Sequence, residues 1–170
     1  MNSKKNLVFL GMMGSGKSSI GSLVSKKLKL KFIDVDNLIE KETRMSISEI
    51  FREKGENYFR NLEERITIKN LKSVSTVISL GGGAFINEKI RKEVLSDHLS
   101  FWLNWDDSTL LKRIIQSKKR PIVNRLSVDE IKRLIKKRSK IYSKADFKIN
   151  CNKLTKTEIV KKVTKIYEIN

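Results

Sequence analysis

Apolar residues along the chain follow two patterns, short unbroken runs and longer stretches at helical spacing. The short runs predict five strands, at Asn6–Leu10, Lys31–Asp34, Thr76–Leu80, Ser100–Asn104 and Phe147–Asn150. The longer stretches predict helices at Ser18–Lys29, Asp36–Thr43, Ile47–Lys72, Glu88–Leu95, Ser108–Ser117, Val128–Ser143 and Lys156–Tyr167. We expect the third of these helices to break near Gly55. S/T-x-x-E capping boxes mark helix starts at Ser46/Glu49, Ser127/Glu130 and Thr155/Glu158.

Strands and helices therefore alternate along the chain, which predicts an α/β fold of three layers. A five-stranded parallel sheet would be flanked by helices on both faces, with ligands bound at the carboxyl ends of the strands. The 170 residues are enough for one core, and no repeat, low-complexity tract or linker divides them. We expect a single domain over residues 1–170.

The loop after the first strand has the sequence of a phosphate-binding loop. Gly11 to Ser18 matches G-x-x-x-x-G-K-[ST], and its glycines let the backbone bend and point N–H groups at phosphate oxygens. Lys17 would reach the β- and γ-phosphates, and the hydroxyl of Ser18 would ligate Mg²⁺. Because a strand precedes the loop and a helix follows it, a nucleotide site is favoured over a bare glycine-rich turn.

Two further segments carry residues that could bind the molecule to which a phosphate is transferred. Asp34 and Asp36 lie at the carboxyl end of the second strand, and both carboxylates share one face if the strand continues. One carboxylate would then belong to the coordination shell of Mg²⁺, and the other would orient the hydroxyl group that attacks the transferred phosphate. The alternative is that Asp36 is the N-cap of a helix beginning at Asn37. The third strand ends in Gly81-Gly82-Gly83, where a small substrate could lie against backbone N–H groups; the alternative is a plain turn.

Two arginines are informative through their positions. Arg138 lies on the apolar stripe of its helix, four residues after Leu134. A buried guanidinium requires an anion, which would be either a structural carboxylate or a ligand. Arg60 lies three residues before Glu63, so the two are either a surface ion pair or an arginine held in place for a ligand.

The only proline of the chain, Pro121, lies in a basic stretch that follows a helix. Since proline ends a helix, we expect a mobile lid over about residues 113–126, with Lys118 to Arg125 as its moving part. Arg120 would then close over the phosphates, with Arg113 on the preceding helix. The alternative is a solvated basic loop.

Charge and composition narrow the choice of partners. The net charge is +18, and 27 of the 37 basic residues are lysines scattered over amphipathic segments. Nucleic-acid sites favour clustered arginine with exposed aromatics, so we expect solvated helix faces that attract an anionic nucleotide, and no nucleic-acid partner. Cys151 and His98 are each single, which excludes an internal disulfide and favours structural roles. With no signal peptide or membrane-length run, we expect a cytoplasmic protein without membrane contact.

Taken in order, the motifs G-x-x-G-x-G-K-S, D-x-D, F-R-x-x-E, G-G-G-A, R-P and R-x-x-x-Y closely resemble those of the shikimate kinase family, over essentially the whole chain. The resemblance implies a P-loop kinase of the nucleoside monophosphate kinase-like group, with a lid. It implies transfer of the γ-phosphoryl of ATP to the 3-hydroxyl of shikimate, giving shikimate 3-phosphate and ADP on the route to chorismate and aromatic amino acids. Mg²⁺ would be the cofactor and ATP and shikimate the partners of a protein that we expect to be a monomer.

The resemblance also implies roles for individual residues. The residues that would bind ATP are Gly14, Ser15, Gly16, Lys17, Ser18, Ser19, Arg113 and Arg120. Ser18 would ligate the metal directly and Asp34 through water, and Arg113 would stack near adenine. The residues that would bind shikimate are Asp36, Arg60, Gly82 and Arg138, the two arginines gripping its carboxylate. The catalytic residues would be Lys17, Asp36 and Arg120.

A few positions depart from the family pattern. Ser19 replaces the usual threonine, RPIV replaces R-P-L-L, and Lys140 stands where many relatives have proline. The segment NCNKLT lacks a familiar proline, so no residue near Asn152 is assigned to adenine. Two alternatives stay open: gluconate kinase, in which we do not expect D-x-D, F-R-x-x-E and G-G-G-A together, and a basic nucleotide-dependent RNA-binding protein, whose binding would depend steeply on salt.

Overall fold

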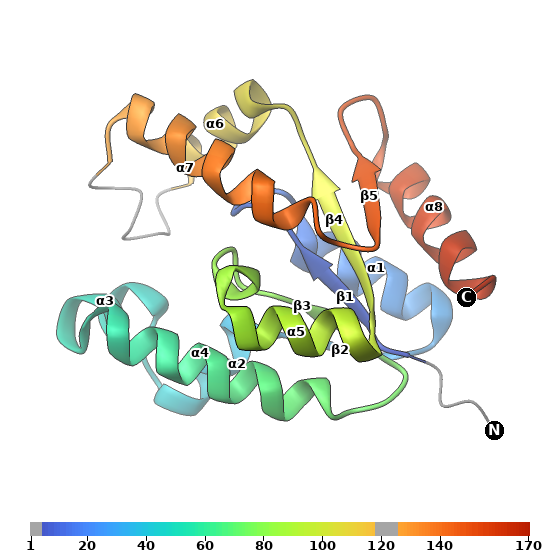
Figure 1. The fold of residues 1–170 in the computed structure, drawn as a ribbon, viewed down its shortest axis with the longest axis horizontal. Helices are drawn as coiled ribbons and strands as arrows, with labels where there is room; N and C mark the ends of the chain where they lie inside the picture. Colours follow the sequence, from blue (N-terminus) through green and yellow to red (C-terminus); the bar gives the residue numbers. More distant parts are fainter. Residues whose placement is uncertain (1–4, 118–125) are drawn as a thin grey trace.

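The computed structural model describes residues 5–117 and 126–170, and in this part of the chain one sheet is covered by helices on both faces (Figure 1). The strands are β1 (Leu7–Leu10), β2 (Lys31–Asp34), β3 (Thr76–Ser79), β4 (Leu99–Asn104) and β5 (Phe147–Asn150). All pair in parallel, in the order β2-β3-β1-β4-β5. The predicted five-stranded parallel sheet is confirmed.

The helices follow the predicted pattern within about two residues at each end. They are α1 (Lys17–Leu28), α2 (Val35–Thr43), α3 (Ile47–Glu53), α4 (Gly55–Leu71), α5 (Glu88–Asp97), α6 (Asp107–Gln116), α7 (Val128–Tyr142) and α8 (Lys156–Glu168), with an unpredicted 3₁₀ turn, η1 (Ala84–Ile86). All three capping boxes are present, at the starts of α3, α7 and α8. The break between α3 and α4 falls where predicted, because Gly55 adopts a φ of +82° that other residues rarely take.

Alternate residues of the central strands face two separate apolar layers. Val8 of β1 and Ile78 of β3 pack with α2, α4, α5 and α7 on one side of the sheet. Leu7 and Phe9 of β1 pack with α1 and α8 on the other. Burial of both strand faces explains why the sequence of β1 is an unbroken apolar run.

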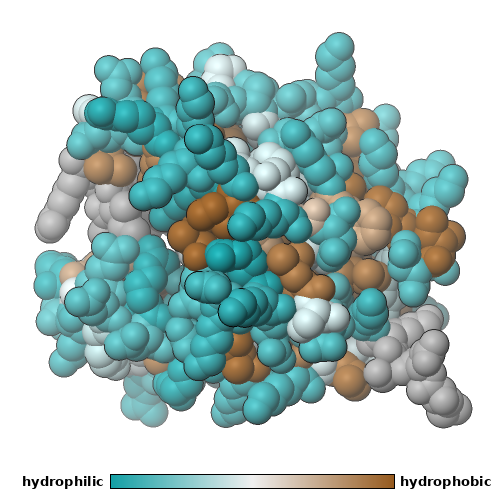
Figure 2. All heavy atoms as spheres, viewed as in Figure 1, coloured by the Kyte–Doolittle hydropathy of each residue, from teal (hydrophilic) through white to brown (hydrophobic). Residues whose placement is uncertain are grey.

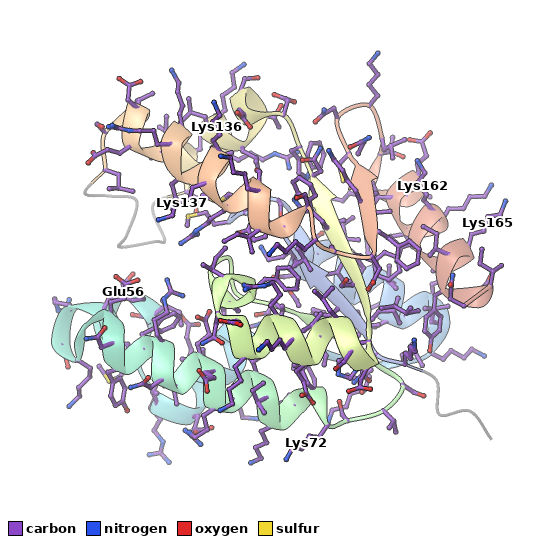
Figure 3. All side chains as sticks on the ribbon, in the orientation of Figure 1. Glu56, Lys72, Lys136, Lys137, Lys162 and Lys165 are labelled. Atoms are coloured by element: carbon purple, nitrogen blue, oxygen red, sulfur yellow. The ribbon has the colours of Figure 1, made fainter. Side chains whose placement is uncertain are left out.

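Lysine side chains are exposed on several helices of the described structure. Hydrophilic residues dominate the face drawn in Figure 2. Lys72 at the end of α4, Lys136 on α7 and Lys165 on α8 are exposed and lie on separate elements (Figure 3). The lysines are thus spread over several helices, as the sequence pattern indicates. None of the described helices combines the length and apolar character that a membrane span requires.

The turn from β2 into α2 differs from the prediction. β2 ends at Asp34, whose carboxylate accepts a hydrogen bond from the N–H of Asn37 at 3.2 Å and so caps α2. Asp36 lies in the first turn of α2. The expectation that both carboxylates share a strand face is therefore wrong, and so is the alternative that Asp36 is the cap. The strand ends at Asp34 as predicted, but the helix begins at Val35, one residue earlier than expected, because Asp34 supplies the capping acceptor.

Candidate functional site

The predicted phosphate loop joins the carboxyl end of β1 to the start of α1. Gly11, Gly14 and Gly16 adopt φ angles of +140°, +77° and +90°, which are strained for any residue with a side chain. Gly16 is the N-cap residue of α1, so the N–H groups of the first turn of α1, which have no acceptor earlier in the helix, are at the loop. These N–H groups and the positive end of the helix make the loop suited to bind an anion.

Polar side chains of the loop lie at the start of the same helix. The Lys17 ammonium is buried and donates to the carbonyl oxygens of Gly11 at 2.9 Å and Met12 at 3.0 Å. Ser18 and Ser19 are exposed in the first turn. Among the described residues no group of three or more His, Cys, Asp or Glu side chains could hold a metal by itself. The exposed hydroxyl of Ser18 suits Mg²⁺, which proteins bind with few side chains and with substrate phosphates.

Helix α6 packs against the outside of the phosphate loop through Arg113. This guanidinium lies 3.8 Å over the ring of Trp105 and donates to the carbonyl oxygen of Gly14 at 3.3 Å. The side-chain oxygen of Asn152 accepts from the N–H of Asp106 at 2.8 Å, which joins the segment after β5 to the start of α6. Arg113 thus lies beside the phosphate loop, and its stacking on adenine stays a prediction.

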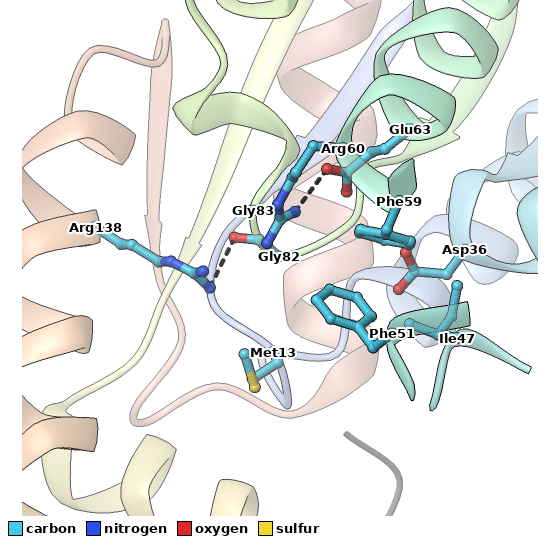
Figure 4. A pocket seen from close by; sticks show the side chains of 10 residues that line it. All are labelled: Met13, Asp36, Ile47, Phe51, Phe59, Arg60, Glu63, Gly82, Gly83 and Arg138. Carbon is cyan, nitrogen blue, oxygen red and sulfur yellow. Dashed lines mark hydrogen bonds and ion pairs between the residues drawn. The ribbon is translucent and has the colours of Figure 1, made fainter. Parts of the chain in front are cut away.

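A pocket adjoins the phosphate loop at Met13 (Figure 4). It is lined by Met13, Asp36, Ile47, Phe51, Phe59, Arg60, Glu63, Gly82, Gly83 and Arg138. The four residues predicted to bind shikimate, Asp36, Arg60, Gly82 and Arg138, all belong to this set. Apolar walls with a few convergent charged groups are typical of small-molecule sites.

Arg60 is oriented by two carboxylates on its own helix. One guanidinium nitrogen donates to Glu63 at 2.7 Å and two others lie 3.3 Å from Glu56. The Glu63 side chain is only 3% exposed, so the alternative of a simple surface pair is wrong. Burial raises the pKa of Glu63, although the positive charge and hydrogen bond of Arg60 act in the opposite direction. A buried carboxylate therefore holds Arg60 at the pocket.

Arg138 reaches the pocket from α7 and is 9% exposed. It donates to the carbonyl oxygen of Gly82 at 3.4 Å, and the Tyr142 hydroxyl donates to the same oxygen. Burial lowers the pKa of the guanidinium, while Tyr142 and Glu63 favour its charged form. Within residues 5–117 and 126–170 no carboxylate forms a salt bridge with Arg138. A buried cation in this position is suited to bind an anionic ligand.

Comparisons with known proteins identify the family. Residues 13–168 match the family model described as shikimate kinase. The chain belongs to the shikimate kinase family. A shikimate kinase from Thermodesulfovibrio yellowstonii is 41% identical over 165 residues, which cover 96% of this chain and 95% of the relative.

Two solved structures extend the likeness to the fold. Shikimate kinase from Acinetobacter baumannii, in complex with shikimate, superposes with a TM-score of 0.91 at 26% identity, covering 98% of this chain and 94% of that one. Shikimate kinase from Aquifex aeolicus superposes with a TM-score of 0.86 at 38% identity, covering 96% of each chain. The predicted P-loop kinase fold is confirmed, and the gluconate kinase alternative is not favoured.

The glycine stretch of this shikimate kinase family member makes room for protein side chains. A Cβ on Gly81 would lie 2.8 Å from a carboxylate oxygen of Asp36, and it would also collide with Glu63. A Cβ on Gly83 would lie 2.5 Å from a guanidinium nitrogen of Arg60. Sequence reasoning assigned the glycines to close contact with a substrate. The structure adds that two of them let the charged groups of the pocket approach the backbone.

Some lining residues were not predicted, and one predicted residue cannot be placed. Met13, Ile47, Phe51 and Phe59 form the apolar wall of the shikimate kinase pocket, but their sequence signal is that of ordinary core residues. Arg120 and most of the predicted lid, residues 118–125, lie outside the described residues.

Proposed function

We propose that this protein transfers the γ-phosphoryl of ATP to the 3-hydroxyl of shikimate, giving shikimate 3-phosphate and ADP. One observation carries the proposal: the buried Arg138, without a salt bridge in the described parts of the chain, lies in the same pocket as Asp36 and the phosphate-loop residue Met13. A small hydroxy acid fits this arrangement, since its carboxylate can pair with Arg138 and its hydroxyl groups can donate hydrogen bonds to Asp36. The shikimate bound to the Acinetobacter baumannii relative supports that choice of acceptor.

On the donor side, the phosphate loop would hold the triphosphate. The N–H groups of Gly14 and Gly16 and those of the first turn of α1 would donate to phosphate oxygens. The N–H of Ser15 would join them by leaving its present partner, the carbonyl oxygen of Met12. Lys17 would exchange its carbonyl partners for the β- and γ-phosphates. Ser18 would ligate Mg²⁺, with Asp34 acting through water, and the metal would supply positive charge between the phosphates.

Two further arginines would complete the donor site. Arg113, held against the phosphate loop by its hydrogen bond to Gly14, would stack near the adenine. Arg120 would stabilise the charge that develops on the transferring phosphoryl. Because Arg120 belongs to the undescribed segment, its role rests on the family motif R-P.

On the acceptor side, two arginines and a carboxylate would orient the ring. The forked guanidinium groups of Arg60 and Arg138 suit bidentate binding of the shikimate carboxylate, with the Gly82 backbone against the ring. Asp36 would accept a hydrogen bond from the 3-hydroxyl of shikimate and so orient the hydroxyl oxygen toward the γ-phosphorus. As the new O–P bond forms and the bond to ADP breaks, the hydroxyl proton would pass to Asp36.

The proposal is tested by measuring ADP release with Mg²⁺-ATP and shikimate, gluconate, quinate or no acceptor. We expect turnover with shikimate and only background rates with the others, and phosphorus NMR should show one phosphate ester at the 3-position. Turnover with gluconate but not with shikimate would contradict the proposal. Removal of Mg²⁺ with a chelator should abolish turnover. Activity without RNA would distinguish a small-molecule kinase from the RNA-binding alternative.

The setting of the reaction follows from the same assignment. Phosphorylation of shikimate would place the protein on the route to chorismate and aromatic amino acids. We propose that it works in the cytoplasm as a monomer with a single domain, without nucleic-acid or membrane partners. Sedimentation at several protein concentrations tests the monomeric state.

A further inference from the structure

Trp105 contacts the phosphate loop from outside, at a position that no predicted role explains. It follows the end of β4, and its indole N–H donates to the carbonyl oxygen of Ser15 at 2.9 Å. Its ring carries the guanidinium of Arg113 at 3.8 Å, and Arg113 donates to the carbonyl oxygen of Gly14. Two consecutive carbonyl groups of the loop are therefore held by one stacked pair of side chains.

The planar trans peptide makes these outward contacts relevant to phosphate binding. In such a peptide the C=O and the following N–H point in opposite directions. The carbonyl of Gly14 turns toward Arg113, and the N–H of Ser15 in the same peptide turns inward to the carbonyl of Met12 at 3.1 Å. By the same geometry, the carbonyl of Ser15 turns toward Trp105 and the N–H of Gly16 turns away from it. That N–H lies at the N-terminus of α1, where a phosphate would bind.

We propose that Trp105 is a positioning residue for the nucleotide site. Its indole N–H fixes the Ser15–Gly16 peptide with the N–H of Gly16 toward the phosphates, and its ring holds the Arg113 guanidinium beside the loop. The proposal rests on the proposed function only in assigning a nucleotide to this loop. It adds a residue that touches neither phosphate nor metal and acts through the backbone of the loop.

A purely structural role does not account for the contacts of Trp105. The ring is half-buried and packs against both apolar layers, which any large apolar side chain would do. The core does not require the hydrogen bond from the indole nitrogen to a loop carbonyl, nor the stacking of a cation on the exposed side. Trp105→Phe therefore separates the two roles, because it keeps an aromatic ring and removes only the donor and part of the surface.

The test measures binding of Mg²⁺-ADP and of inorganic tripolyphosphate, without acceptor, to wild type, Trp105→Phe and Trp105→Leu. A neutral hydrogen bond corresponds to about two- to tenfold in affinity, so Trp105→Phe should weaken both ligands by that factor. Equal weakening of tripolyphosphate, which has no base, would show that the effect passes through the loop. Trp105→Leu should weaken ADP by about two- to fivefold more, because Arg113 loses its aromatic support. Shikimate affinity should change less than twofold in both.

Fluorescence gives a readout that does not depend on replacing Trp105. The chain has two tryptophans, so in Trp102→Phe the tryptophan emission, excited selectively over that of the tyrosines, comes from Trp105 alone. Tripolyphosphate should change that emission with the same midpoint as its binding. The proposal is overturned if Trp105→Phe binds both ligands as tightly as wild type, if shikimate affinity falls equally, or if the emission does not respond. A protein that binds ADP as expected yet fails to phosphorylate shikimate would sink the proposed function and leave this inference standing.

Discussion

The Tyr142 hydroxyl donates a hydrogen bond to the carbonyl oxygen of Gly82, the same oxygen that accepts from the Arg138 guanidinium. Tyr142 is 1% exposed and lies one turn after Arg138 on α7. Two donors on one helix face thus fix the glycine stretch and, through the rigid peptide, the direction of the Gly83 N–H. The shape of the acceptor pocket depends on this contact between α7 and the end of β3.

Tyr142→Phe should weaken acceptor binding, because it removes the hydroxyl and keeps the buried ring. Loss of one hydrogen bond predicts a rise of about two- to tenfold in the KM for shikimate, with the KM for ATP unchanged, in steady-state kinetics. Tyr167→Phe is the matched control, since Tyr167 is also buried but lies on α8, on the other side of the sheet. Equal changes in the two variants would show that the hydroxyl of Tyr142 has no specific role.

Arg138→Lys should show how much the planar guanidinium contributes to shikimate affinity beyond its positive charge. Lysine keeps the positive charge but loses the planar fork, so shikimate affinity should fall by about tenfold to more than a hundredfold. ATP affinity should barely move. The substrate control is shikimate methyl ester, which should be a poor acceptor for wild type and less penalised when Arg60 and Arg138 are both replaced. If wild type phosphorylates ester and acid equally well, the two arginines do not hold a carboxylate.

Asp36→Asn should abolish most of the turnover while ATP still binds. The amide keeps the shape of the side chain in the first turn of α2 but cannot take the hydroxyl proton. Loss of a general base or of its orienting effect costs about 10²- to 10⁴-fold in rate. Asp34→Ala is a useful comparison, because alanine removes the oxygen that caps α2 and should therefore also lower the melting temperature. Unchanged turnover in Asp36→Asn would leave the hydroxyl without its proposed partner.

His98 should make the stability of the protein depend on pH below neutrality. Burial lowers its pKa from the ordinary 6.5; Asp97 and Glu93 oppose this and Lys5 adds to it. At pH values between the lowered pKa of folded His98 and the ordinary pKa of 6.5, the unfolded chain binds more protons than the folded protein. The stability that neutral His98 contributes is therefore fully present above pH 6.5 and is lost as the pH falls toward the pKa of the folded state. The slope cannot exceed about 1.4 kcal/mol per pH unit for one group.

The measurement is urea unfolding of wild type and His98→Asn between about pH 5 and pH 8. Since His98 is the only histidine, the difference between the two proteins should isolate its contribution. Glu63, whose raised pKa acts in the opposite sense, is present in both and cancels. Parallel stability curves for the two proteins would show that His98 titrates alike in the folded and unfolded states.

Local sequence patterns determined the fold class, the phosphate loop and the inward position of Arg138. Side-chain periodicity placed the strands and helices, and three capping boxes marked helix starts that the structure confirms. The phosphate loop could be identified because its function resides in contiguous backbone, where Gly11, Gly14 and Gly16 need φ angles that other residues rarely adopt. The inward position of Arg138 followed from its place on the stripe of α7, and the structure buries it.

Contacts between distant segments decided the rest. The carboxyl ends of β2, β3 and β1 lie side by side in the sheet, which brings Asp36, Gly82 and the phosphate loop together. Only this assembly shows that Glu63 is buried behind Arg60, that Asp34 and not Asp36 caps α2, and that Trp105 holds the loop from outside. Capping and periodicity depend on neighbours within a few residues. Burial and long-range hydrogen bonds depend on chain packing, which the local pattern does not specify.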